Sequence, residues 1–252
     1  SQIAVGLDNV DLKAATANHI VVSHTPGVLT EACADHAWAL MLSAARMIVP
    51  SYKYVIDGKW TQQDPMAFLG KDVYGATLGL IGPGRIGQAV CRRASGFSMK
   101  VLYHGPHEKP ELSQTGAKYV PLDKLLKESD YVVLTCPLTD STKHMIGYDQ
   151  LKLMKKDAIL VNIARGPVVV TSDLERALRE GIIGAAALDV TDPEPLPADH
   201  PILKLPNCLV VSHIASATIQ TRATMSLIAA QAIIDALDGK HVKYCANPDV
   251  YK

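Results

Sequence analysis

The stretch Thr77-Leu78-Gly79-Leu80-Ile81-Gly82-Pro83-Gly84-Arg85-Ile86-Gly87 decides the fold. It joins a short apolar run to a G-x-G-x-x-G turn, and the residues after the turn have helical periodicity. Gly82 permits the tight turn, Gly84 lets the backbone approach a pyrophosphate, and Gly87 allows the helix to pack closely on the strand. Alone, the pattern also fits a plain glycine-rich turn. Its place between a strand and a helix favours a dinucleotide-binding site.

The phosphate donors of this turn are expected at the start of the helix. Pro83 has no N–H to donate, so the donors should be the backbone N–H groups of Arg85 and Ile86. These groups lie at the positive end of the helix dipole, which attracts phosphate.

Short apolar runs alternate with helical patterns on both sides of the turn. Strands are expected at residues 77–81, 100–103, 131–135, 158–162, 185–190 and 209–212, and helices at 85–95, 121–128, 148–153 and 172–180. Most of the strands are continuous apolar runs, as expected for strands covered on both faces. The sequence therefore predicts an α/β fold, a doubly wound parallel sheet of the Rossmann type. Ser172 with Glu175 predicts a capping box for the last helix, and Gly181 predicts its end.

Two longer helices frame this core. The first is expected from Leu29 to Val49, where Pro50 bends or ends it. The second is expected from Thr218 to Leu237, where Asp238-Gly239 closes it.

The composition excludes several classes of protein. Lys+Arg and Asp+Glu balance at 25 each, so no net field draws the chain to nucleic acid or anionic lipid. No apolar run approaches the roughly 20 residues of a membrane span, and the first residues lack a signal-peptide pattern. The five cysteines are scattered, without a C-x-x-C pair, and the nine histidines show no metal-ligand spacing. We therefore expect a cytoplasmic protein with no metal site and no nucleic-acid or membrane partner.

The second half of a dinucleotide fingerprint is an acid at the end of the next strand, where it binds the adenosine 2′-hydroxyl. No acid stands at the end of the strand 100–103, and the nearest is Glu108. His104, His107 and Lys109 could instead neutralise a 2′-phosphate, or they could be incidental charges of a solvated loop. The sequence thus favours NADP(H) as the cofactor and leaves NAD(H) possible.

Three further polar residues follow three of the predicted strands. Arg165 follows the strand 158–162, Glu194 lies on the proline-rich loop after 185–190, and His213 follows 209–212. The carboxyl ends of parallel strands meet at one edge of the sheet, beside the glycine-rich turn, which is where ligands bind in such folds. Each residue alone could be a surface ion-pair partner or a loop residue. Their convergence at this edge favours a catalytic site.

These residue types suit the reduction of a 2-oxo acid. Arg165 offers a planar fork that matches a carboxylate and an adjacent carbonyl oxygen. His213 can exchange a proton near neutral pH, and Glu194 would orient its imidazole. The hydride chemistry itself would belong to the nicotinamide.

With these residues the sequence resembles the D-isomer-specific 2-hydroxyacid dehydrogenase family along nearly its whole length. The matching segments are residues 6–8, 25–30, 79–88, 162–166, 189–195 and 213–218. Residues 193–197, 200–201, 221–222 and 224–227 look most like the glyoxylate/hydroxypyruvate reductases of that family.

The resemblance implies roles for further residues. It implies that Arg165 binds the substrate, that Glu194 supports the base and that His213 is the acid/base. It also implies that the backbone of Val5 and Gly6 holds the substrate carboxylate, with Ser216 lining the pocket. Around the cofactor it implies contacts from Asp189, from the Ile163 carbonyl, from Pro137 and from the segment at Ala215, where the family often has glycine.

The resemblance also implies an organisation. Residues 1–28 and 219–252 would belong to a flavodoxin-like substrate lobe, and residues 29–218 would form the dinucleotide-binding domain. Because the family's lobe begins well before Ser1, we expect the sequence to be a fragment. Family members are usually homodimers, so the resemblance implies a homodimer with the helix from Leu29 and the arm Trp60–Gly70 as the contacts. Gln63 and Asp64 stand in that arm where the nearest relatives have a tryptophan, which puts a preference for hydroxypyruvate in doubt.

Two alternatives stay open. The first is another enzyme on the same frame, such as a phosphoglycerate, formate or phosphite dehydrogenase. Glu194 argues against the formate dehydrogenases, whose corresponding position resembles glutamine. The second is a dinucleotide-sensing corepressor scaffold that retains the three polar residues without turnover.

Overall fold

The computed structural model describes all 252 residues, Ser1–Lys252. The chain divides into two compact units, Ala34–Ala215 and Ser1–Cys33 with Ser216–Lys252, and each is described by itself. No helix is long and apolar enough to cross a membrane.

The unit Ala34–Ala215 is built on one seven-stranded sheet in the order β3-β2-β1-β4-β5-β6-β7, and every neighbouring pair of strands is parallel. The predicted doubly wound parallel sheet is therefore confirmed. The strands are β1 (Thr77–Ile81), β2 (Lys100–His104), β3 (Lys118–Tyr119), β4 (Tyr131–Leu134), β5 (Ile159–Asn162), β6 (Ala185–Leu188) and β7 (Cys208–Val210). The order reverses between β1 and β4, so the glycine-rich turn after β1 lies at the switch point.

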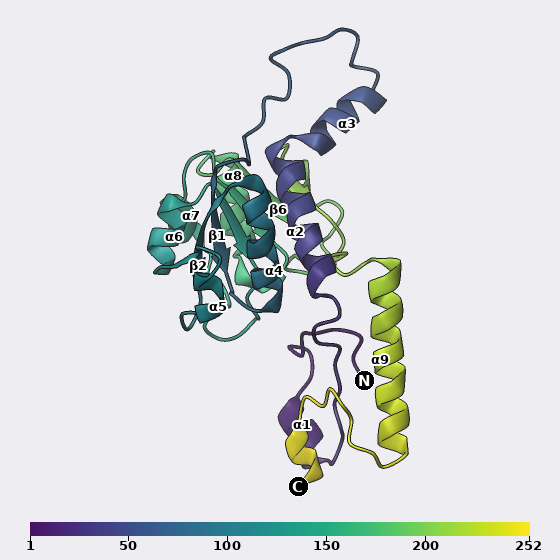
Figure 1. Cartoon of the computed structure of the whole chain (residues 1–252). Helices are drawn as coiled ribbons and strands as arrows, with labels where there is room; N and C mark the ends of the chain where they lie inside the picture. The colour runs from purple at the N-terminus through teal and green to yellow at the C-terminus, as the bar shows by residue number, and fades with distance from the viewer. The chain divides into compact units, whose positions relative to one another are not determined.

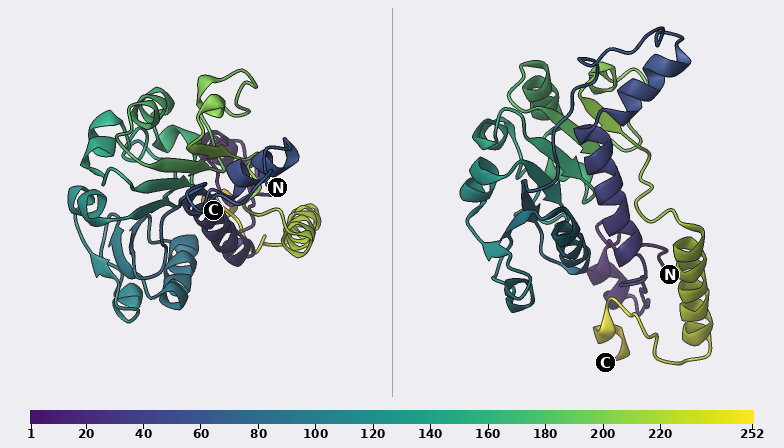
Figure 2. Two further views of the ribbon diagram at one scale, coloured as in Figure 1. Left: turned by 90° about the horizontal axis from the view of Figure 1, so that it is seen from above. Right: turned by 45° about the horizontal axis from the view of Figure 1, so that its top comes forward.

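Helices cover both faces of this sheet (Figures 1 and 2). The helices of this unit are α2 (Thr30–Ala45), α3 (Ile48–Ile56), α4 (Arg85–Ala94), α5 (Pro110–Ser113), α6 (Leu122–Glu128), α7 (Tyr148–Leu153) and α8 (Thr171–Arg179), with short 3-10 turns η1 (Ser95–Phe97), η2 (Gly166–Val168) and η3 (Pro201–Lys204). Of these, α3 projects away from the sheet in Figure 1 and buries none of its residues. In Figure 1, α6 and α7 lie on one side of the strands and α4 and α2 on the other. Every residue of β4 and β5 is buried, which is why their sequences are apolar without alternation.

Polar contacts join the elements of this unit. The Trp38 indole donates to the Val90 carbonyl at 3.1 Å and fastens α2 to α4. At the amino edge of the sheet, the Asp130 carboxylate accepts from Lys155 at 2.8 Å, from the Thr77 N–H at 2.8 Å and from Lys71 at 3.3 Å. Asp130 thus connects the chain before β1 to β4 and β5.

The predicted helix from Leu29 to Val49 is wrong in one respect. α2 ends at Ala45, Met47 takes a left-handed conformation with φ +50°, and α3 begins at Ile48. Pro50 does not end a helix. It lies in the first turn of α3, where its missing N–H has no intrahelical partner to lose.

Two other local expectations differ from the structure. α8 begins at Thr171 after Val170, without a side-chain cap, so Ser172 and Glu175 form no capping box. Glu175 pairs instead with Arg179 one turn further on. The two-residue edge strand β3 was not predicted, because so short a pairing leaves no periodic pattern. Gly181, with φ +66°, follows α8 as predicted.

The second unit contains α1 (Leu12–Ala17), α9 (Ile219–Leu237) and the 3-10 turn η4 (Pro248–Tyr251). Asn247 joins its parts, because its side chain accepts from the Val22 N–H at 2.8 Å and donates to the Ile20 carbonyl at 2.9 Å. The Thr218 side chain caps α9, and Gly239 follows its end with φ +71°, as the sequence predicts.

Candidate active site

The glycine-rich turn has the geometry that a dinucleotide phosphate needs. Gly82 has φ +99°, and a Cβ there would lie 2.4 Å from the Cys136 nitrogen. A Cβ on Gly87 would lie 2.3 Å from the Gly82 carbonyl oxygen, so helix α4 packs on this turn only with glycine there. A Cβ on Gly84 would meet no protein atom within 4 Å. Close contacts within the protein therefore require glycine at positions 82 and 87, whereas the space beside Gly84 is open to a ligand.

The start of α4 presents unused donors at this turn. Its first intrahelical bond runs from the Gln88 N–H to the Gly84 carbonyl at 2.9 Å. The N–H groups of Arg85, Ile86 and Gly87 consequently have no partner in the helix, and no side chain caps them. The residues present fit a dinucleotide pyrophosphate.

The end of β2 places the three basic candidates differently. The His104 ring is half-buried, lies parallel to Tyr119 and bonds the Val120 carbonyl through Nδ1 at 3.1 Å. Both backbone groups of Lys109 meet the Tyr103 hydroxyl, at 2.9 and 3.3 Å, which fixes this residue near the strand end. His107 is exposed.

Arg165 stands on a turn that Asn162 shapes. The buried Asn162 side chain accepts from the Ala164 N–H and donates to the Arg165 carbonyl, both at 3.0 Å. The Arg165 guanidinium donates to the Ala164 carbonyl at 2.7 Å. Asn162 lies in the matching segment 162–166, but no feature of the sequence predicts that its side chain shapes this turn.

The turn of Arg165 is packed directly on the loop that carries Glu194. A Cβ on Gly166 would lie 1.8 Å from the Thr191 carbonyl oxygen, so the two backbones touch. The Thr171 hydroxyl donates to the Asp192 carbonyl at 2.8 Å and tightens the same junction. The peptide bonds before Pro193 and Pro195 are both cis.

Glu194 and His213 are brought together as the sequence predicts. The His213 Nδ1 lies 2.6 Å from the Glu194 Oε1, and the other carboxylate oxygen accepts from the Thr191 N–H at 3.3 Å. Both side chains are open to solvent, with 46% of His213 and 40% of Glu194 exposed. The imidazole is therefore oriented by the carboxylate while it stays accessible to a small substrate.

The Asp189 carboxylate is fully buried and binds the loop that follows His213. Its Oδ1 accepts from the Ile214 N–H at 2.7 Å, and its Oδ2 accepts from the Ala215 N–H at 3.0 Å. The His36 Nε2 lies 3.1 Å from Oδ1. Burial alone would raise the pKa of Asp189, but the hydrogen bonds from His36 and from the two backbone N–H groups hold the pKa below its usual range.

The remaining predicted residues divide between the two units. Ile163 is buried after β5, and Pro137 is exposed after β4. Val5, Gly6 and Ser216 belong to the other unit. There the Val5 carbonyl lies 3.0 Å from the His24 ring, and the Gly6 carbonyl accepts from the Gln2 amide at 2.8 Å.

Sequence reasoning missed His36 in this site. It lies inside α2, far from the motifs in sequence, and no pattern of spacing connects it to Asp189. The one available signal was that His36, a polar residue that is only partly exposed, lies next to the buried Ala37 of α2.

Comparison with known proteins identifies the class. The sequence profile of the D-isomer specific 2-hydroxyacid dehydrogenase NAD-binding domain matches residues 38–215. The chain therefore belongs to the D-isomer specific 2-hydroxyacid dehydrogenase family, and the predicted resemblance is confirmed.

Its relatives include reductases of small 2-oxo acids. It is 49% identical to a glyoxylate reductase of Korarchaeum cryptofilum over 254 residues, which cover 100% of this chain and 76% of the relative. It is 47% identical to glyoxylate/hydroxypyruvate reductase B of Escherichia coli, with 99% and 78% of the two chains covered. Among solved structures, that of an NADPH-dependent glyoxylate/hydroxypyruvate reductase from Sinorhizobium meliloti with NADP and malonate superposes with a TM-score of 0.90 at 32% identity, covering 97% of this chain and 76% of that one.

Proposed function

We propose that this chain reduces small 2-oxo acids, glyoxylate and hydroxypyruvate among them, to D-2-hydroxy acids with a nicotinamide dinucleotide. The observation that carries the proposal is the 2.6 Å contact between His213 and Glu194, at the same sheet edge as the turn of Arg165. The names of the reductases from Korarchaeum cryptofilum and Escherichia coli support the substrate class.

The chain's own groups would bind the substrate and move the proton. The dinucleotide supplies the hydride when it is bound, held by the N–H groups of Arg85 and Ile86. Arg165 would bind the carboxylate and the carbonyl oxygen of the 2-oxo acid. Glu194 accepts the Nδ1 proton of His213, so Nε2 is the atom that gives a proton to the carbonyl oxygen during reduction and takes it back during oxidation.

A steady-state assay tests this function. The complete protein is supplied with NADPH or NADH and with glyoxylate or hydroxypyruvate, and the loss of reduced cofactor is followed. Loss of the general acid in His213→Ala should lower kcat by about 10²- to 10⁴-fold. His19→Asn, at an exposed histidine with the same left-handed backbone, should leave kcat unchanged. Cofactor binding without turnover on any 2-oxo acid would instead favour the scaffold hypothesis.

The cofactor proposal is a preference for NADP(H), with NAD(H) as the second substrate. No carboxylate stands at the end of β2, where the Val120 carbonyl holds the His104 ring and the Tyr103 hydroxyl holds the backbone of Lys109. Lys109→Glu should lower the ratio of kcat/KM for NADPH to that for NADH by about 10- to 100-fold, because one charge-assisted contact becomes repulsive. Lys127→Glu makes the same charge change on the exposed end of α6 and should leave the ratio unchanged.

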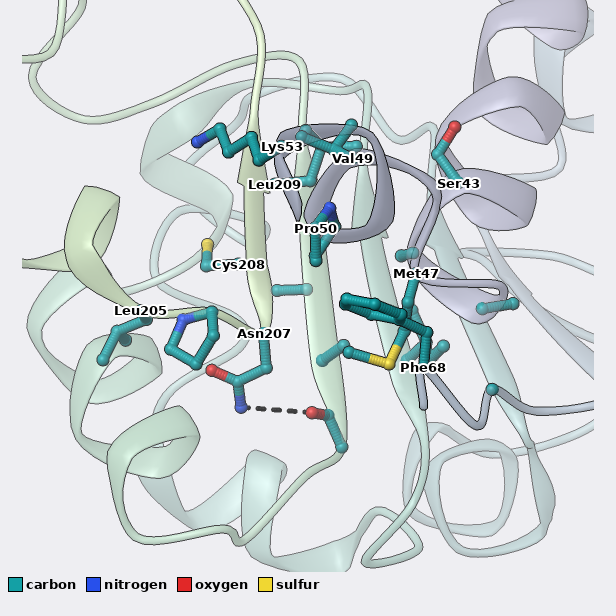
Figure 3. Close-up of a pocket in the computed structure, with 18 of the residues that line it drawn as sticks. Ser43, Met47, Val49, Pro50, Lys53, Phe68, Leu205, Asn207, Cys208 and Leu209 are labelled. Carbon is teal, nitrogen blue, oxygen red and sulfur yellow. Dashed lines mark hydrogen bonds between the residues drawn. The ribbon is translucent and has the colours of Figure 1, made fainter. Parts of the chain in front are cut away.

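The partner proposal is a second copy of the chain. α3 buries none of its residues, and Tyr52, Ile56 and the Trp60 of the arm are each more than 60% exposed. A cavity of about 640 Å³, shown in Figure 3, lies between α3, the arm and the strands β6 and β7. Several large apolar side chains exposed together on one helix and arm are typical of an interface.

Sedimentation velocity tests the second copy. We expect a dimer for the wild-type chain and a monomer for Tyr52→Glu with Ile56→Glu, because both changes place charge on the apolar face of α3. A monomeric wild-type chain at micromolar concentration would contradict the proposal. The cytoplasmic location stays a prediction from the sequence.

A further inference from the structure

Three consecutive N–H groups around His213 are held by a single residue. The His213 N–H bonds the Asp189 carbonyl at 2.9 Å, and the next two N–H groups bond the two oxygens of its side chain. His213 itself has φ +55°, a left-handed conformation that residues other than glycine rarely adopt. Such a conformation persists only where the surroundings determine it.

The Asp189 side chain is fully buried, so water cannot compensate a lost partner. Its Oδ1 has two donors, the Ile214 N–H and the His36 ring, whose side chain is only 16% exposed. A buried carboxylate is stabilised by such donors, and it is costly when one is removed. His36 therefore keeps the carboxylate ionised and fixes its position against the loop.

We propose that His36 and Asp189 form a positioning pair that fixes the backbone of His213. The pair does not touch the substrate; it acts through the loop, and Glu194 then orients the ring. The proposal rests on the proposed function only in that His213 is its acid/base.

The pair is connected to a helix and not to another loop. His36 lies in α2, where Trp38, two residues on, is stacked on Phe97 with ring centroids 4.5 Å apart. The helix is thereby held against the body of the same unit, and a side chain carried on it is a firmer support than one on a loop. The His36 ring contacts Asp189 through Nε2, its nitrogen farthest from the backbone, and the amide nitrogen of a glutamine can occupy the same position.

Hydrogen exchange of the Ile214 and Ala215 amides tests the pair without any assumption about activity. In His36→Leu we expect these amides to exchange about tenfold faster than in the wild type, since the carboxylate loses one of its fixed donors. In His36→Gln we expect exchange close to the wild-type rate. Asp35 lies next to His36 on α2 and forms an ion pair with Arg93 of α4. Asp35→Ala removes that ion pair and serves as the control, with no change expected at these amides.

The kinetic arm separates positioning from cofactor contact. His36→Leu should lower kcat for glyoxylate by about tenfold or more, because a small misplacement of the acid slows proton transfer. Its KM for NADPH should stay within about twofold of the wild type, and His36→Gln should restore kcat. If the leucine variant does not fold, His36→Asn, whose amide is too short to reach Oδ1, replaces it.

Two results would overturn the pair. One is unchanged exchange of both amides in His36→Leu. The other is a raised KM for NADPH at constant kcat, which would assign Asp189 to the nicotinamide alone. An inactive wild-type chain would refute the proposed function, while the exchange experiment would still decide the pair.

Discussion

The packing of Gly166 against Thr191 allows a sharp prediction for Gly166→Ala. The added Cβ would lie 1.8 Å from the Thr191 carbonyl oxygen, 2.1 Å from its carbonyl carbon and 2.7 Å from the Asp192 nitrogen. All three are backbone atoms, so no side chain can rotate away. The turn of Arg165 and the loop of Glu194 must therefore separate.

The size of the effect follows from this separation. Restoring an ordinary contact of about 3.4 Å needs a shift of roughly 1.5 Å between the two loops. Overpacking of this kind costs about 1–3 kcal/mol of unfolding free energy. Because the shift moves Arg165 relative to the acid/base pair, and 1 Å of misplacement costs about 10²-fold, we expect kcat/KM for glyoxylate to fall by about 100-fold or more.

Urea denaturation and steady-state kinetics measure the two effects. Gly96→Ala is the matched control, because Gly96 lies in η1 and a Cβ there would meet no atom within 4 Å. It should leave kcat/KM unchanged and leave stability unchanged or slightly higher. A Gly166→Ala variant with wild-type stability and kcat/KM would refute the idea that this contact sets the distance between the two loops.

Three further predictions concern other parts of the chain. Burial alone would raise the pKa of Asp130, but its hydrogen bonds, that from Lys155 first, hold the pKa below its usual value. The stabilisation by the Asp130 carboxylate is therefore present above about pH 4 and is lost as the pH falls through the lowered pKa. In urea denaturation, Asp130→Asn should lose less stability than the wild type between about pH 5 and pH 2. Gly87→Ala should weaken NADPH binding in a fluorescence titration by about tenfold or more, since the turn and α4 must move apart. His24→Ala removes the contact with the Val5 carbonyl, so the segment that the family resemblance assigns to the substrate carboxylate is less fixed, and KM for glyoxylate should rise severalfold with less effect on kcat.

The sheet could be predicted because its signals are local. Each strand of the core is a short apolar run bounded by turn residues, and β1 with its glycine turn fixes the place of the dinucleotide site. The edge strand β3 and the break at Met47 could not be predicted, since a two-residue pairing and a single left-handed residue depend on tertiary contacts. Pro50 was misread because proline both ends helices and begins them.

The candidate site was predictable as a set of chemical types but not as an assembly. Arg165, Glu194 and His213 follow consecutive strands, so the topology alone brings them to one edge. The contacts that set their distances join residues far apart in sequence, such as His36 with Asp189. Only the folded chain reveals those partners.

The exposure of His213 and Glu194 explains why such supports are needed. With 46% of His213 and 40% of Glu194 exposed, their ion pair is worth about 1 kcal/mol at most. A left-handed backbone at a residue other than glycine costs a comparable amount, about 1 kcal/mol or more. The ion pair of Glu194 with His213 therefore cannot hold its own geometry against the backbone strain at His213. The buried bonds of Asp189 can, because a buried carboxylate that lost its partners would cost several kcal/mol. The geometry of this edge thus depends on residues that need not meet the substrate, and the groups proposed to meet it stay free to exchange protons with water.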